Sequence, residues 1–241
     1  VINIKRKDGP HYSNLNFGLR LSYNKVNVGW DFNSDEFLNN DLNSTFLNQF
    51  ESLSLKNLSL TGSFGYVTRI YENNKVSINL SSGFRSPNID DIGKIRENAG
   101  ILLIPNTTVK PEKAYTIDFG WANFSDKFNS ALNIYYTVLD GTIGRDFFYD
   151  STDTTTNDMS TIIYQNDEVY TMSTYNLGQS EVYGFNYRIH VNFFKNVDFT
   201  SNLTYTKGTK LNSKNPMPSI PPVFGDFKLT WNYASNKLVL A

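Results

Sequence analysis

The chain has 241 residues, a formal net charge of -1 and no cysteine. The lack of cysteine excludes disulfides, thiolate metal sites and a cysteine nucleophile, and the balanced charge gives no indication of nucleic-acid binding. Aromatic residues make up 15% of the sequence, with 18 Phe and 15 Tyr. No run approaches the roughly 18 apolar residues of a transmembrane helix, so a soluble β protein and a membrane β-barrel remain as alternatives.

Apolar and polar residues alternate in about ten stretches of the chain, the pattern of β-strands with one apolar face. We expect one strand around each of these alternating stretches, whose apolar residues lie, in chain order, at residues 15–23, 26–32, 58–68, 76–84, 115–121, 132–145, 183–193, 197–205, 227–233 and 238–241. One face of each carries Leu, Ile, Val and aromatic residues, and the other carries Asn, Thr, Ser, Asp, Arg and Gly. The sequence therefore predicts an all-β fold.

The connections between these strands alternate strictly in length. Short turns are expected at residues 24–25, 72–75, 125–128, 195–196 and 234–237. Long, irregular connections are expected at about 35–56, 85–112, 147–174 and 208–221. In an up-and-down antiparallel sheet every second connection lies at the same end, so all short turns share one end. Short periplasmic turns and long extracellular loops are typical of an antiparallel transmembrane β-barrel.

Strand length and aromatic placement agree with this interpretation. The expected strands run about 9–15 residues, which suits a tilted membrane span of about 9–11 residues. Five aromatic residues lie beside the short turns, where a periplasmic aromatic girdle is expected: Trp121, Phe124, Phe193, Trp231 and Tyr233. A secreted β-sandwich or β-helix is the alternative, and release from membranes by salt or carbonate without detergent would favour it.

Short motifs flank the second long connection. The chain reads FRSPN at 84–88, PN at 105–106 and VKPEK at 109–113. Proline has no backbone donor and favours an extended preceding residue, so both proline motifs are expected at strand ends. In this order the motifs resemble those of TonB-dependent outer-membrane receptors, in which an FRxP motif ends one barrel strand and an NPxLKPE motif opens the next.

Two later motifs extend the resemblance over residues 58–235. NLG at 176–178 with VYGF at 182–185 resembles a family strand, although Asn186 stands where an acid is usual, and IPP at 220–222 resembles a strand start. The resemblance implies a 22-stranded barrel in the Gram-negative outer membrane, plugged by a globular domain through which TonB supplies energy. Residues 1–241 would be about ten strands of that barrel, surrounded by outer-membrane lipid, with the plug and barrel closure outside this chain.

No catalytic constellation is present in the sequence. There is no glycine-rich phosphate loop, nucleophile elbow or pair of histidines at metal spacing, so we expect neither an enzyme, a cofactor nor a resident metal. The polar face of a strand carries His190, and His11 lies near the N-terminus. Both are expected to be solvated or to face the barrel interior.

The long loops carry the candidate ligand-binding residues. The guanidinium forks of Arg85 and Arg96 suit an anionic ligand, or pair with Asp90 and Asp91. These two acids, with Glu97, suit a cation or a solvated surface. Four loop tyrosines suit stacking on an aromatic or sugar ligand or an outer aromatic girdle: Tyr149, Tyr164, Tyr170 and Tyr175.

The resemblance also narrows the ligand. Haem-uptake members of the family carry an axial histidine between the FRxP and NPxLKPE motifs, and residues 88–104 contain none. Because imidazole is a common axial ligand of haem iron, this favours a ferric siderophore or similar small iron chelate. The alternatives are a haem, glycan or peptide importer, the last two with a surface lipoprotein, or a non-transporting structural barrel in a surface or secretion complex.

Overall fold

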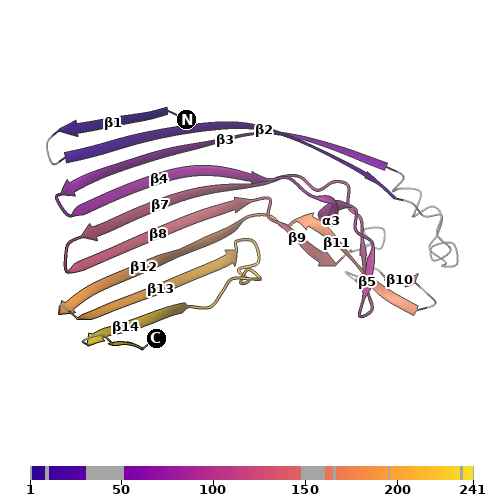
Figure 1. The fold of residues 1–241 in the computed structure, drawn as a ribbon. Coiled ribbons are helices and arrows are strands. Elements are labelled where there is room, and N and C mark those ends of the chain that lie inside the picture. The colour runs from indigo at the N-terminus through magenta and orange to yellow at the C-terminus, as the bar shows by residue number, and fades with distance from the viewer. Residues whose placement is uncertain are drawn as a thin grey trace.

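A computed structural model describes residues 2–8, 11–30, 52–147, 161–164, 167–194, 196–233 and 236–240. The described residues form a ten-stranded sheet, a five-stranded sheet and one short helix (Figure 1). No helix in these ranges is both long and apolar enough to cross a membrane. The expectation of an all-β chain is confirmed.

The larger sheet is an up-and-down meander. Its strands are β1 (Ile2–Asp8), β2 (His11–Gly29), β3 (Ser52–Tyr71), β4 (Asn74–Arg85), β7 (Glu112–Phe124), β8 (Phe128–Asp140), β12 (Ser180–Phe194), β13 (Val197–Lys210), β14 (Phe224–Tyr233) and β15 (Asn236–Leu240). Neighbours pair antiparallel in chain order, with the remaining strands left out. The edge strands β1 and β15 do not pair with each other, so the sheet is an open part of a barrel.

Each strand of the large sheet presents one apolar and one polar face. On β7 the side chains of Tyr115, Ile117 and Phe119 are 51%, 48% and 41% exposed, although they are among the most apolar of the strand. Between them, on the other face, Asp118 accepts a hydrogen bond from Asn79 of β4 at 3.3 Å. Aromatic and aliphatic residues favour strands, and their period of two puts them all on one face. We call these surfaces the apolar face and the polar face.

The expected turn at residues 24–25 is wrong. Strand β2 continues without a break through Asn24 and Lys25, which pair with Asn57 and Lys56 of β3. The apolar residues change phase here, from odd positions up to Tyr23 to even positions from Val26 onward, and a turn produces the same pattern. The chain instead crosses straight on, and its apolar side chains move from one face of the sheet to the other. The tenth strand is β1, which pairs with the first part of β2.

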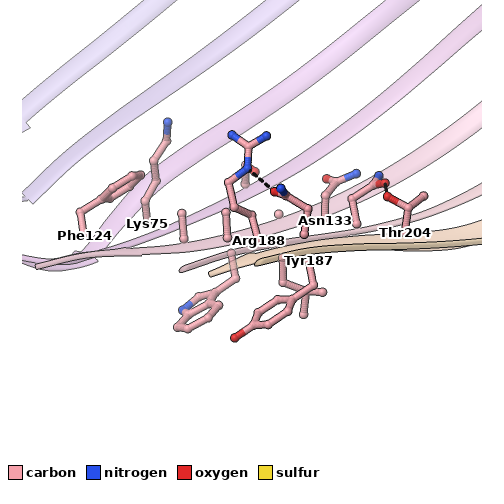
Figure 2. Close-up of a pocket in the computed structure, with 14 residues that line it drawn as sticks. Lys75, Phe124, Asn133, Tyr187, Arg188 and Thr204 are labelled. Carbon is pink, nitrogen blue, oxygen red and sulfur yellow. Dashed lines mark hydrogen bonds between the residues drawn. The ribbon is translucent and has the colours of Figure 1, made fainter. Parts of the chain in front are cut away.

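The predicted aromatic girdle is partly correct. Phe193 and Trp231 are 57% and 47% exposed near the short connections. Phe124 does not belong to it, because its ring points to the polar side with Lys75 and Arg188, whereas Tyr187 points to the opposite side (Figure 2). Alternation explains the difference, since Phe124 is three positions from Trp121 and therefore on the other face of β7. The side chain of Tyr233 lies outside the described set.

The long connections after β4 and β8 are not irregular, as the sequence had indicated. They contain helix α3 (Ile89–Ile92) and the strands β5 (Arg96–Asn98), β6 (Ile101–Ile104), β9 (Ile143–Phe147), β10 (Thr161–Tyr164) and β11 (Asp167–Asn176). Strand β11 lies at the centre of the small sheet, parallel to β6 and antiparallel to β9 and β10. This sheet lies at the end of the large sheet opposite the short connections (Figure 1).

The buried apolar side chains gather at the same end. Leu102, Ile104, Tyr164 and Val169 form one cluster on one face of the small sheet. A second cluster joins Val28 of β2 to Ile92 and Val109, with partly buried side chains of β2 and β3 around it. The even-numbered apolar residues at the end of β2 thus pack against α3, and the indole N–H of Trp30 donates to the Gly93 carbonyl oxygen at 2.7 Å.

Candidate ligand-binding face

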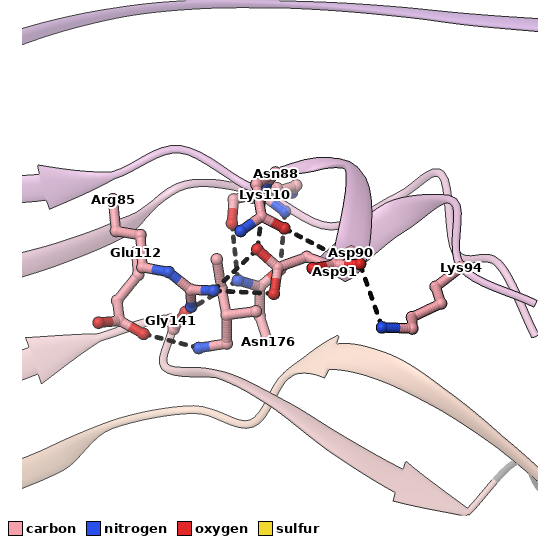
Figure 3. Close-up of polar contacts among 10 residues, drawn as sticks. Arg85, Asn88, Asp90, Asp91, Lys94, Lys110, Glu112, Gly141 and Asn176 are labelled. Atoms are coloured by element: carbon pink, nitrogen blue, oxygen red, sulfur yellow. Dashed lines mark hydrogen bonds and ion pairs between the residues drawn. The ribbon is translucent and has the colours of Figure 1, made fainter. Parts of the chain in front are cut away.

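The FRSPN motif forms the start of helix α3. Arg85 Nη2 donates to both carboxylate oxygens of Asp91 at 2.8 Å (Figure 3). The side chain of Asn88 accepts from the Asp91 N–H at 2.9 Å, and Asp91 accepts from the Asn88 N–H at 3.0 Å, which is a capping box. Pro87 is fully buried beside them. The motif therefore fixes how the chain leaves β4.

The later motifs bind the two long connections to each other. The Asn176 side chain accepts from the Lys110 N–H at 2.8 Å and donates to the Lys110 and Gly141 carbonyl oxygens at 2.9 and 2.8 Å (Figure 3). The Glu112 carboxylate accepts from the Ile143 N–H at 2.8 Å. Gly141 has a φ of 68°, which favours glycine and lets the chain bend between β8 and β9. These residues position the small sheet over the strand ends.

The acids predicted as candidate ligands are engaged in contacts within the chain. Asp91 pairs with Arg85, and Asp90 pairs with Lys94 at 3.2 Å, four residues later. Within the described part of the chain, no group of three or more His, Asp or Glu side chains is placed to hold a metal ion. Of the two readings given to Arg85, the pair with Asp91 is the one observed.

The face of the small sheet opposite the Leu102 cluster brings together cationic side chains from both long connections. Arg96 is opposite Leu103, Leu103 is opposite Met172, and Arg145 is opposite the next residue of that face, Thr174. A cavity of about 200 Å³ lies between Lys94, Arg96, Asn98 and Arg145, with a floor of apolar side chains from β6 and β11. We call this surface the basic face.

The two guanidinium groups of the basic face are available to bind a ligand. No carboxylate among the described residues forms an ion pair with Arg96 or Arg145. Glu168 shares this face but lies further along β11, where it accepts a hydrogen bond from the Thr161 hydroxyl at 2.7 Å. A guanidinium group presents several N–H donors in a planar fork, so two of them beside one cavity suit carboxylate, phosphate or phenolate oxygens.

The predicted tyrosines separate. Tyr170 lies on the basic face with its ring 47% exposed, and Phe147 contacts it edge to face with ring centroids 6.4 Å apart. Tyr164 is only 8% exposed and packs in the opposite, buried face, so it does not reach a ligand on the basic face. Tyr149 lies outside the described residues.

The fourth predicted tyrosine, Tyr175, is the second one on β11 and is partly buried. Burial raises the pKa of its phenol, and the nearby carboxylate of Asp146 raises the pKa further. Both effects disfavour the phenolate, so Tyr175 stays neutral at physiological pH. Nearby, Ser173 is 1% exposed and donates to the Ile104 carbonyl oxygen at 3.0 Å.

The polar face of the large sheet has its own cavity, near the short connections. It has a volume of about 480 Å³ and is lined by Lys75, Asn133, Arg188 and Thr204 among others (Figure 2). Arg188 Nε donates to the Asn202 side-chain oxygen at 2.8 Å, and Asn202 donates to the Asp226 carboxylate at 3.0 Å. His190 contacts the Thr200 hydroxyl at 3.0 Å on the same face, as expected for a residue facing the barrel interior.

Sequence reasoning placed Arg96 and Tyr170 in the site but missed Lys94, Asn98 and Arg145. The available signal was the alternation after Gly141, where Ile143, Arg145 and Phe147 share one face of β9. That pattern places an arginine beside an aromatic residue on one strand face. The pattern does not show which strands of the connection after β4 lie on the same face as Arg145.

The curved antiparallel sheet with an exposed apolar face, short turns at one end and an elaborated cap at the other defines a membrane β-barrel of the outer-membrane class. A family model described as TonB dependent receptor-like, beta-barrel, matches residues 9–238. The chain belongs to this family of outer-membrane receptor barrels. No curated protein sequence matches it.

Solved structures support the same fold. The chain resembles the copper transporter OprC with a TM-score of 0.64 and 16% identity, covering 92% of this chain and 31% of that one. It resembles the siderophore receptor PirA from Acinetobacter baumannii with a TM-score of 0.62 and 13% identity, covering 98% and 40%. It also resembles the Serratia marcescens hemophore receptor HasR, solved with its hemophore HasA and heme, with a TM-score of 0.57 and 11% identity, covering 93% and 39%. The chain thus spans less than half of each of these proteins.

Proposed function

We propose that this chain is part of the barrel of an outer-membrane receptor that takes up an anionic ferric chelate of the siderophore type. Residues 1–241 supply ten barrel strands and the capture surface. The plug and the closing strands belong to the rest of the protein, and energy reaches the plug from TonB. The chain binds and admits its ligand and catalyses no reaction.

One observation carries the proposal. The basic face places Arg96 and Arg145 beside one cavity without a carboxylate partner among the described residues, and the exposed ring of Tyr170 lies on the same face. A ferric chelate holds its iron with its own oxygen atoms, so a receptor needs only to recognise its charge and shape. Guanidinium groups match the anionic oxygens, and an aromatic ring contacts the planar parts of such a chelate.

Two features favour a siderophore over haem. Residues 88–104 contain no histidine to serve as an axial ligand. The open face instead offers charge complementarity from two strands that come from different connections. Among the structures that resemble this chain are a copper transporter, a siderophore receptor and a hemophore receptor, so the fold alone does not select the ligand.

The test uses cells in which the full-length receptor is the sole route for iron uptake. Uptake of ferric enterobactin, an anionic catecholate chelate, is compared between the wild type and the double variant Arg96→Gln/Arg145→Gln. Each lost charge-assisted hydrogen bond weakens binding by about 1.5–3 kcal/mol, so losing one from each arginine should raise the half-saturating concentration at least about 100-fold. The control is Arg69→Gln/Lys127→Gln, which removes two exposed cations at the opposite end of the sheet.

Two results would contradict the proposal. Unchanged uptake by the Arg96/Arg145 variant would show that the basic face does not capture the chelate. Growth on haem, with no growth on any anionic chelate, would show that the ligand class is wrong. Uptake by the control variant is expected to match the wild type.

A further inference from the structure

The apolar face of β2 and β3 changes abruptly from exposed apolar side chains to a pair of lysines. Below the lysines, Leu19, Leu21 and Tyr23 of β2 are 79%, 68% and 60% exposed, and Leu58 and Leu60 of β3 are 68% and 69% exposed. The stretch from Leu15 to Tyr23 spans nine residues, the length of a tilted membrane strand. Directly above it, on the same face, the next pair of opposed residues is Lys25 and Lys56.

The two lysines are placed unfavourably for a protein surface in water. They are directly opposite each other in the β2–β3 ladder, and both are exposed. Like charges at opposed positions of a sheet repel each other. No carboxylate of the described residues forms an ion pair with either lysine. The next pair above them, Asn27 and Ser54, is neutral, and the Ser54 hydroxyl donates to Asn27 Oδ1 at 2.9 Å.

An apolar groove begins below the lysines on β2 and β3 and extends across β4, β7 and β8. It has a volume of about 630 Å³ and passes over Gly62, between Leu19 of β2 and Leu80 and Ile117 of the following strands. Gly62 pairs with Leu19, and its missing side chain leaves the space open. Because Gly62 follows Lys56 by six residues, the groove is about 20 Å further along the strand. At a strand tilt of about 40° this is a depth of about 15 Å, or one leaflet.

We propose that Lys25, Lys56 and the groove over Gly62 form a binding site for one phosphate-bearing lipid of the outer leaflet. The phosphate lies between the two ammonium groups and relieves their repulsion, Tyr23 lies at the interface level, and an acyl chain fills the groove. The site rests on the membrane placement in the proposed function, but not on the identity of the transported ligand. A free anion would contact only the two lysines, whereas a lipid would also place an acyl chain in the groove.

The test measures binding of lipid A, a diphosphorylated acyl lipid, to the purified full-length receptor in detergent by native mass spectrometry. An ammonium group facing an anionic lipid surface contributes about 1 kcal/mol, so Lys25→Gln/Lys56→Gln should lower the affinity about thirtyfold. The control Lys113→Gln/Lys207→Gln removes two exposed lysines from β7 and β13 and should leave the affinity unchanged. Heat-modifiable mobility on gels confirms that each variant is folded.

A second variant tests the groove. Gly62→Ile places a side chain in the space that the acyl chain occupies, and its Cβ meets only the end of the Leu19 side chain at 3.3 Å and a backbone oxygen at 3.5 Å. Losing the burial of about two methylene groups should weaken lipid A binding about tenfold. Inorganic phosphate should not displace the lipid, and uncharged phosphatidylcholine should bind far more weakly.

The proposal is overturned if the Lys25/Lys56 variant binds lipid A as the control does, if phosphatidylcholine binds equally well, or if inorganic phosphate displaces the lipid. Ferric enterobactin uptake is measured in the same variants. Lipid binding without any chelate uptake in the wild type would contradict the proposed function and leave the lipid site supported. If the wild type takes up the chelate but lipid binding does not depend on the two lysines, the proposed function is supported and the lipid site is contradicted.

Discussion

The large sheet leaves its apolar side chains exposed, whereas the small sheet buries them. Ile117 and Ile134 of the large sheet are 48% and 47% exposed, but Leu102 of the small sheet is 1% exposed. The buried aliphatic and aromatic side chains of the described ranges belong to the small sheet, to helix α3, to the connection before β7 or to the end of β2. One chain therefore contains one region that needs an apolar solvent and another that makes its own core in water.

This difference explains why the family motifs are where they are. The large sheet and the small sheet meet at the ends of β4, β7 and β8, where the backbone groups of the junction need hydrogen-bond partners outside either sheet. Asn88, Asn106 and Asn176 supply such partners through side-chain hydrogen bonds to backbone atoms. The motifs are thus structural features of the junction, whereas the basic face that we propose for ligand capture lies outside them.

The largest effect is expected from a charge placed on the apolar face. Ile134→Lys puts an ammonium group toward the hydrocarbon and should destabilise the folded receptor by about 2–4 kcal/mol. Asn133→Lys, one residue earlier on the polar face, should have little effect because Asn133 lines the cavity with Lys75 and Arg188 (Figure 2). Urea unfolding in lipid vesicles measures both variants. Equal destabilisation by the two would contradict the assignment of faces.

The next largest effect is expected from a substitution that creates a cavity in the small sheet. Leu102→Ala removes a fully buried side chain and should cost the small sheet about 3 kcal/mol of local stability. Leu60→Ala on the apolar face, where the side chain is 69% exposed, should cost much less. Hydrogen exchange of the β6 and β11 amides reads out the difference. Unchanged protection in Leu102→Ala would show that the cluster does not hold the small sheet together.

The junction is tested by Asn176→Ala. This change removes three hydrogen bonds to Lys110 and Gly141 and should cost about 2 kcal/mol. Faster proteolysis between β8 and β11, with an intact large sheet, is the expected result. The matched control is Asn123→Ala near the short turns, where a single bond of 3.2 Å to Asn74 is lost. Equal proteolysis of both variants would contradict the proposal that Asn176 holds the junction together.

The smallest effect concerns pH. Because burial raises the pKa of Tyr175, the folded small sheet keeps the phenol proton longer than the unfolded chain does. Its stabilising contribution is therefore complete below the ordinary tyrosine pKa of about 10 and is lost as the pH rises through the raised value. Hydrogen exchange of β11 should accelerate in this range for the wild type and less for Tyr175→Phe. Identical pH profiles would contradict this role.

The large sheet was predictable because its period of two is a local property. Alternation located nine of its ten strands, and the alternation of short and long connections indicated the barrel. The same local pattern also produced the error at Asn24. The apolar residues change from odd to even positions there, and both a turn and an unbroken strand whose apolar side chains change face produce such a change. Only the ladder with β3 distinguishes them.

The small sheet was not predictable for a different reason. Its central contact is the parallel pairing of Leu102 with Thr171, which are far apart in the sequence and belong to different connections. Apart from β11, its strands have only three to five residues, so their periodicity is weak. Arg96 and Arg145 are likewise far apart in the sequence, and no local signal indicates that they share a cavity.

Spin-label accessibility tests the central contrast most directly. Residues 1–241 contain no cysteine, so a nitroxide can be attached to a cysteine introduced at Ile134 or at Tyr170, in a full-length receptor in which any other cysteine has been replaced, held in lipid nanodiscs. The account predicts that the label at position 134 is relaxed by oxygen and not by a water-soluble nickel complex, and that the label at position 170 behaves in the opposite way. Strong relaxation of both labels by the nickel complex would contradict it.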